Sequence, residues 1–94
     1  MSVSLVKSPS RATLAATRLH PTPDRMNDLA GDLIILACLT DDPDVYWALL
    51  RAVNAATIAS RYAVFSGQYL DRVFLTVSGA LTTYEAYALQ PTDG

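Results

Sequence analysis

The clearest pattern in the chain is a helical spacing of hydrophobic residues that begins near residue 23. Thr22, Pro23 and Asp24 place a capping hydroxyl, a proline and a carboxylate where the start of a helix favours them. Apolar residues then recur at intervals of three and four over 23–39, which predicts a helix with one buried face. That face is expected to hold Met26, Leu29, Ala30, Leu33, Leu36 and Ala37.

The second half of this predicted helix is apolar on every side. Beyond Asp32, the positions outside the expected core face are also hydrophobic: Ile34, Ile35, Cys38 and Leu39. A helix that is hydrophobic all round is normally buried all round. We therefore expect other elements to enclose residues 33–39 completely, and we expect Cys38 to be an inert core cysteine.

A second helix start follows almost at once. Asp42, Pro43 and Asp44 repeat the start signal, and apolar and alanine positions continue over 43–64. Two helices joined by so short a connection normally pack antiparallel. The sequence therefore predicts a mostly α domain that is built on an antiparallel helix hairpin of 23–39 and 43–64.

The segment 68–89 is a third apolar element, and it has two interpretations. As a helix it presents one apolar face, formed by Leu70, Val73, Phe74, Val77, Leu81, Tyr84 and Ala88. As a strand, Val73, Leu75 and Val77 alternate with their neighbours, and nearby glycines fit turns. We favour the helix because its face persists longer than the alternation. The alternative is an α+β fold in which residues 61–89 form a small antiparallel sheet.

The two ends of the chain are polar. Residues 1–22 form a basic arm, rich in Ser and Thr and free of acidic residues, in which a short helix is expected between a Ser10 cap and His20. Residues 91–94 form a polar tail. The predicted organisation is an arm at 1–22, one globular helical domain at 23–90 and a tail at 91–94.

The composition restricts the classes of partner. Hydrophobic residues make up 51% of the chain and charged residues only 17%, which excludes intrinsic disorder of the whole chain. The formal net charge of -2 gives no general positive field, so nucleic acid is a disfavoured partner. No stretch reaches the roughly 18 consecutive apolar residues of a membrane-spanning helix. The apolar surplus instead favours a protein partner, in a homo-oligomer or a larger complex.

Residues that carry catalytic or cofactor chemistry are scarce. His20 is the single histidine, and no orienting partner lies near it in the sequence, so we expect no enzyme activity, metal site or cofactor. The four glycines fit no phosphate-binding motif. One cysteine excludes an internal disulfide and favours an intracellular, cytoplasmic location. The arm also resembles an organellar transit peptide in composition.

Two groups of side chains are candidate contacts for a protein partner. All aromatic residues lie from residue 46 onward, and Tyr and Trp are enriched in interfaces. The aromatic candidates are Trp47, Tyr62, Phe65, Tyr69 and Tyr84. The second group, Asp24, Asp28 and Asp32, is spaced by four residues along one helix side, and this acidic stripe suits a basic segment of a partner.

A short local motif covers residues 58–79. The sequence reads IASRYAV at 58–64 and SGQYLDRVF at 66–74, followed by Gly79. This motif resembles the second helix-turn-helix of AraC-type transcription regulators, whose pattern is roughly IAxxxGfS-x-x-YLSRxF-x-x-x-x-G. The chain departs from that pattern at Ala63, where the family has glycine.

The resemblance implies a DNA-binding module. It would place a recognition helix at 67–76, with Gln68, Tyr69 and Arg72 facing the major groove. Asp71 lies in the same segment, and the lysines and arginines that normally contact phosphates are few.

The residues therefore favour a non-catalytic interaction or structural protein. We expect a small subunit that homo-oligomerises or packs into a larger assembly through apolar and aromatic surface, with the basic arm reaching an acidic neighbour. A helix-turn-helix regulator that binds DNA is the alternative.

Overall fold

The chain folds into four helices in the computed structural model, which describes residues 9–62 and 67–88. These ranges hold no strand, and the helices are α1 (Pro9–Leu19), α2 (Pro23–Leu39), α3 (Pro43–Tyr62) and α4 (Gly67–Ala88). The prediction of a mostly α fold is thus confirmed. The alternative with a sheet at 61–89 is wrong, because the apolar positions of α4 from Leu70 to Leu81 keep a helical spacing and form one buried face. Of the later residues predicted for that face, Tyr84 is half-buried and Ala88 is exposed.

The starts of α2 and α3 are fixed by the predicted capping residues. The Thr22 hydroxyl accepts a hydrogen bond from the Arg25 backbone N–H at 3.1 Å. At the start of α3, Asp42 Oδ1 accepts from the N–H groups of Asp44 at 2.9 Å and Val45 at 3.4 Å. These bonds satisfy backbone donors that a helix start leaves without partners, so the connection at 40–42 has little freedom.

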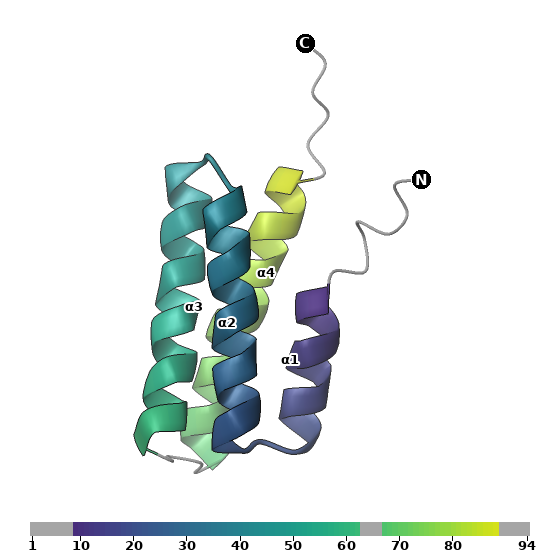
Figure 1. The fold of residues 1–94 in the computed structure, drawn as a ribbon, viewed down its shortest axis with the longest axis vertical. Coiled ribbons are helices and arrows are strands. Elements are labelled where there is room, and N and C mark those ends of the chain that lie inside the picture. The colour runs from purple at the N-terminus through teal and green to yellow at the C-terminus, as the bar shows by residue number, and fades with distance from the viewer. Residues whose placement is uncertain (1–8, 63–66, 89–94) are drawn as a thin grey trace.

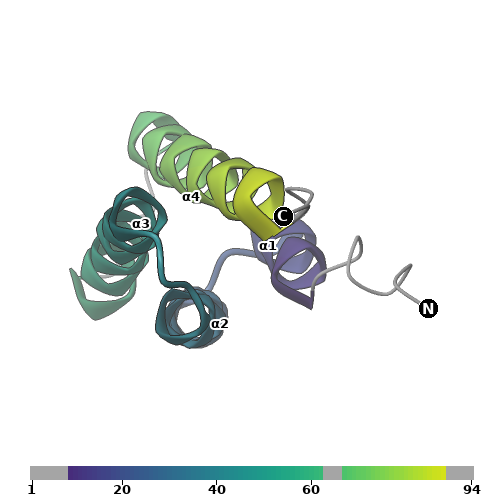
Figure 2. The same ribbon diagram turned by 90° about the horizontal axis from the view of Figure 1, so that it is seen from above.

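The helices surround one apolar core. In the end-on view of Figure 2, α1 lies opposite α3 and α2 lies opposite α4. The antiparallel hairpin of α2 and α3 is held at its open end by Ser60, whose hydroxyl donates to the Pro23 carbonyl at 2.9 Å. The largest fully buried apolar side chains are Met26, Leu29, Leu33, Leu49, Leu81 and Val77. The predicted core face of α2 is therefore confirmed in full.

The contact between α3 and α4 uses small side chains on the α3 side. Ala52, Ala56 and Ala59 are fully buried, and α4 contributes larger residues such as Val77 and Leu81. Small residues let the two helix axes approach closely. The two longest helices can therefore pack against each other. In Figure 1, α4 passes behind α2, and its first turns lie near the end of α3.

The helix α1 belongs to the same packed body, although it lies within the stretch 1–22 that the sequence predicts as an arm. It contacts α2 and α4, and its Leu14 is part of the core. Its last hydrophobic residue, Leu19, is 75% exposed. Leu14 is the only buried hydrophobic residue that α1 contributes among residues 11–19, so this helix is the least firmly embedded of the four.

The prediction that the second half of α2 is enclosed on every side is wrong. Ile34, Ile35 and Leu39 are 46%, 59% and 65% exposed, and Cys38 is exposed as well. The physical reason lies in the arrangement of the helices. Each helix has its neighbours on the inner side only, so nothing in the described part of the chain covers the outer face of α2.

Two leucines of α4 provide a matched test of this core. Leu81 is fully buried and Leu75 is 72% exposed. Leu81→Ala is expected to lower the free energy of unfolding by about 2–5 kcal/mol, because it leaves a cavity. Leu75→Ala is expected to change it by no more than about 0.5 kcal/mol. Urea denaturation followed by circular dichroism measures both, and equal losses would contradict the packing.

Candidate functional site

Most of the large exposed apolar residues of the hairpin lie on either side of its connection, whereas Ile58 and Tyr62 are exposed farther along α3. We define the hairpin face as seven residues within about two helical turns of residues 40–42. They are Ile34, Ile35, Cys38 and Leu39 of α2, and Tyr46, Trp47 and the half-buried Leu50 of α3. An apolar surface of this kind on a small protein is typical of an interaction site.

The connection beneath this face is held by side-chain hydrogen bonds. The half-buried Tyr87 of α4 reaches across to it, and its hydroxyl oxygen accepts from the Asp41 backbone N–H at 3.1 Å. The Thr40 hydroxyl accepts from the Asp42 N–H at 3.2 Å, and Thr40 is itself buried. The hairpin face therefore rests on a turn that is tied both to its own residues and to the last turn of α4.

Two aromatic rings begin the α3 side of the face. Tyr46 and Trp47 pack edge to face, with ring centroids 5.5 Å apart and an interplanar angle of 78°. This geometry is favourable for aromatic pairs. Trp47 is nevertheless 57% exposed, so the pair leaves much of the indole available for contact.

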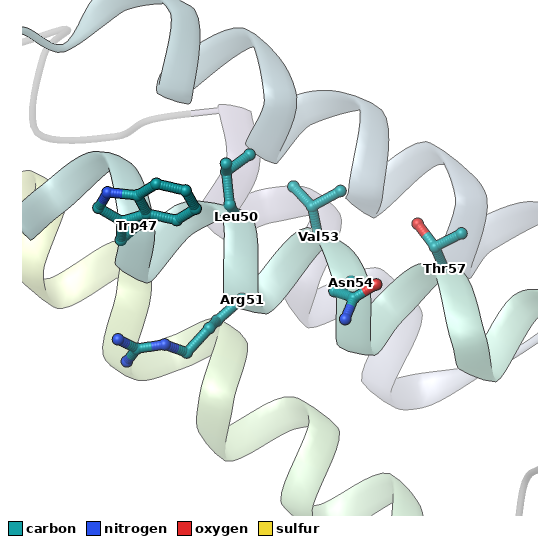
Figure 3. Close-up of a pocket in the computed structure, with 6 residues that line it drawn as sticks. All are labelled: Trp47, Leu50, Arg51, Val53, Asn54 and Thr57. Carbon is teal, nitrogen blue, oxygen red and sulfur yellow. The ribbon is translucent and has the colours of Figure 1, made fainter. Parts of the chain in front are cut away.

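A shallow open groove of about 510 Å³ continues the face along α3. Trp47, Leu50, Arg51, Val53, Asn54 and Thr57 line it. Figure 3 shows Leu50, Val53 and Thr57 along one side of the helix, with Arg51 extending away from them. Arg51 is exposed and forms no ion pair with any residue in the described ranges. The groove thus combines an apolar floor with one available positive charge.

The aromatic candidates from the sequence do not form one site. Trp47 lies on the hairpin face, whereas Tyr62, 66% exposed, lies at the far end of α3. Tyr69 and Tyr84 are half-buried against the core, and the Tyr84 ring packs near that of Tyr87 at 6.2 Å. Phe65 lies outside the described residues.

The acidic stripe of α2 is divided by the fold. Asp24 and Asp28 are exposed, but Asp32 is half-buried and accepts a hydrogen bond from the Thr13 hydroxyl at 2.7 Å. Asp32 therefore contacts α1 of its own chain. The two remaining carboxylates are left as a solvated surface on the first turns of α2.

The residues implied by the AraC-type resemblance are partly accessible. Gln68 and Arg72 are exposed one turn apart on α4, next to the exposed Asp71, while Tyr69 packs against the core. The proposed recognition segment at 67–76 is the first half of a continuous 22-residue helix. The residues that join it to α3 lie outside the described ranges, so DNA binding stays a prediction.

The basic residues of the N-terminal region contact α4 of the same chain. Arg11 forms an ion pair with Glu85 at 3.0 Å, and the Arg18 guanidinium lies 5.8 Å from the centre of the Phe74 ring. Sequence reasoning missed Glu85 as a partner of Arg11, and no local signal links residues so far apart. It also missed the exposed aliphatic residues of α2 as a surface. The signal that could have revealed them, the absence of polar residues beyond Asp32, was interpreted as complete burial.

Neither reactive side chain considered in the sequence lies in a catalytic arrangement. His20 is exposed at the end of α1, and Cys38 is exposed on the hairpin face. The expectation of a buried core cysteine is therefore wrong, because Cys38 points to the outer side of α2. In residues 9–62 and 67–88, no group of three His, Cys, Asp or Glu side chains is placed to hold a metal ion.

No helix in the described ranges is long and apolar enough to cross a membrane. Comparison of the chain with models of protein families, with curated proteins and with solved structures found no match.

The exposure of Cys38 gives a direct test of the hairpin face. In dilute solution, Ellman's reagent is expected to modify one thiol of the folded protein at a rate close to that of the denatured chain, because an exposed thiol needs no unfolding to react. Absorbance of the released thiolate measures the rate. Cys38→Ser is the blank, since the chain has one cysteine. A reaction that needs denaturant would place the thiol in the core and contradict this exposure.

Proposed function

We propose that this protein is a non-catalytic interaction protein, a small subunit that associates with copies of itself or within a larger assembly through the hairpin face. The observation that carries the proposal is the exposure of Ile35, Leu39 and Trp47, between 57% and 65%, on one end of a fixed hairpin. Complete burial of a large apolar side chain contributes about 1.5–3 kcal/mol, and covering the exposed part of each of these residues contributes a share of that free energy.

The hairpin face has the features of a protein interface. Its apolar residues are flanked by the charged groups Asp41, Asp44 and Arg51, all exposed. Stable interfaces combine an apolar centre with a polar rim, and tryptophan is among the residues that contribute most to binding. A preformed surface also loses little conformational entropy when a partner binds. The hydrogen bonds of the Tyr87 and Thr40 hydroxyls to the turn hold this surface in place in the unbound protein.

One row of α3 has a charge order that suits pairing with itself. Asp44, Trp47 and Arg51 are spaced by three and four residues, so they follow one another along one side of the helix, and all three are exposed. A two-fold axis near Trp47 would lay α3 antiparallel to its copy. Asp44 of each copy would then face Arg51 of the other, on both sides of a central tryptophan pair. This self-complementary order favours a homo-oligomer.

The self-association is tested by one substitution and a matched control. Trp47→Asp is expected to weaken association by about 30-fold or more, because it removes a large buried contact and places a charge in the apolar centre. Leu75→Asp changes an apolar side chain that is even more exposed than Trp47 but lies on α4, away from the face, and is expected to behave like the wild type. Sedimentation velocity from micromolar to near-millimolar concentration measures both.

Two outcomes would count against self-association through this face. A wild-type protein that remains monomeric over the whole range would exclude it. Equal weakening by Trp47→Asp and Leu75→Asp would show that the effect is not specific to the hairpin face.

DNA binding is the competing function, supported by the exposure of Gln68 and Arg72 on one side of α4. A DNA-binding protein would bind a duplex with an affinity that falls steeply with salt, because phosphate contacts release counterions. Arg72→Ala would then weaken binding several-fold. Fluorescence anisotropy of a labelled duplex at two salt concentrations measures this, with Arg25→Ala on α2 as the control. Under the interaction proposal, neither protein binds the duplex.

A further inference from the structure

The helix α1 is attached to α4 chiefly by one polar cluster around Arg11. Its Nε donates to Glu85 Oε2 at 3.0 Å, and one terminal nitrogen donates to Glu85 Oε1 at 3.1 Å. The same guanidinium also donates to the hydroxyls of Thr82 at 3.0 Å and Ser78 at 3.2 Å. We call these four hydrogen bonds the Arg11 clasp. A two-pronged pairing of guanidinium and carboxylate is directional as well as strong, so it also sets the position of α1.

The remaining contacts of α1 are mainly with α2; they bury Leu14 and Thr17 and include several polar groups. Thr13 donates to Asp32 of α2 at 2.7 Å, and Arg18 lies over the Phe74 ring. Leu14 is the one buried hydrophobic side chain between residues 11 and 19. When α1 detaches, water replaces the partners of these polar groups, so the net free-energy cost of breaking each contact is smaller than the strength of the bond itself. A helix held in this way can leave and return far more easily than α2, α3 or α4.

The connection between α1 and α2 favours an extended course. It comprises His20, Pro21 and Thr22, and α2 begins at Pro23. Both His20 and Thr22 precede a proline, which disfavours the helical region and pushes a residue toward extended angles. Thr22 is in fact extended, with φ -135° and ψ 161°. Short hinges of restricted geometry are a known route to exchange of an element between copies.

We propose that α1 exchanges between two copies of this chain. The α1 of each copy would occupy the groove between α2 and α4 of the other. Its Thr13, Arg18 and Arg11 would there make the contacts seen within one chain. Their partners would be Asp32, Phe74 and Glu85 of the other copy. Because every contact of α1 is reproduced, the exchanged dimer differs from the monomer mainly at the hinge. The groove and the clasp are separate from the hairpin face, so this inference does not depend on the proposed function.

Opposite charge reversals provide the test. Arg11→Glu and Glu85→Arg each place like charges in the clasp of a monomer and of a dimer of identical chains. In an equimolar mixture of the two variants, an exchanged heterodimer contains one native and one reversed pair, and both pairs are attractive. The mixture, warmed briefly and cooled, is expected to contain at least about tenfold more dimer than either variant alone. Light scattering after size exclusion measures the mass.

Controls separate this test from the hairpin face and from misfolding. All variants carry Trp47→Asp, so association through the hairpin face does not contribute. The double variant Arg11→Glu/Glu85→Arg restores the pair within one chain and is expected to match the Trp47→Asp parent in mass and helicity. A mixture that forms no more dimer than its components would overturn exchange of α1.

A covalent trap tests the same inference with the clasp intact. Thr13→Cys and Asp32→Cys, in a Cys38→Ser background, replace two short side chains whose oxygen atoms are 2.7 Å apart. Oxidation then links α1 to α2 within one chain in the monomer and between chains in the exchanged dimer. The fraction of covalent dimer on a non-reducing gel is expected to rise with the protein concentration before oxidation. Monomer alone at every concentration would overturn the proposal, and the single-cysteine variants report random crosslinking.

Discussion

The packing of α2 against α3 is the contact on which the rest of the molecule depends. Capped helix starts at Thr22 and Asp42 set where each helix begins, and a connection of only three residues makes the two helices antiparallel. Once Leu33 and Leu49 are buried, the orientation of every other side chain on the two helices follows from the helical repeat. The inward sides become core, and the outward sides near the connection become the hairpin face.

The other two helices complete this hairpin in different ways. The helix α4 packs against α3, whose buried side is mostly alanine, and supplies large apolar side chains to the core from Leu70 to Leu81. The helix α1 closes the remaining side with little apolar area and several charged or hydroxyl contacts. The molecule therefore combines three strongly embedded helices with one that is bound through polar groups. Its two candidate surfaces for self-association, the hairpin face and the groove beneath α1, lie on different sides of the same core.

Features that depend on neighbouring residues in the chain, such as helix limits, were predicted correctly from the sequence. Features that depend on contacts between distant residues, such as the exposure of a helix face, were not. The limits of α2, its buried face and both proline-containing helix starts were predictable because capping and helical spacing are local signals. The exposure of Ile35 and Cys38 was not, because the number of helices that surround α2 is a property of the whole fold. Arg11 and Glu85 are 74 residues apart, and no pattern in one sequence pairs them. At the candidate site, Trp47 was found by its residue type, whereas the aliphatic part of the face was assigned to the core.

The position of Trp47 also determines what the tryptophan fluorescence of this protein reports. It is the only tryptophan in the chain, and its indole is about half exposed to water on the outside of α3. Indole emission shifts with the polarity around the ring. The wavelength of its emission therefore reports whether the hairpin face around Trp47 is covered. A binding partner that covers the indole would therefore be detectable without any label.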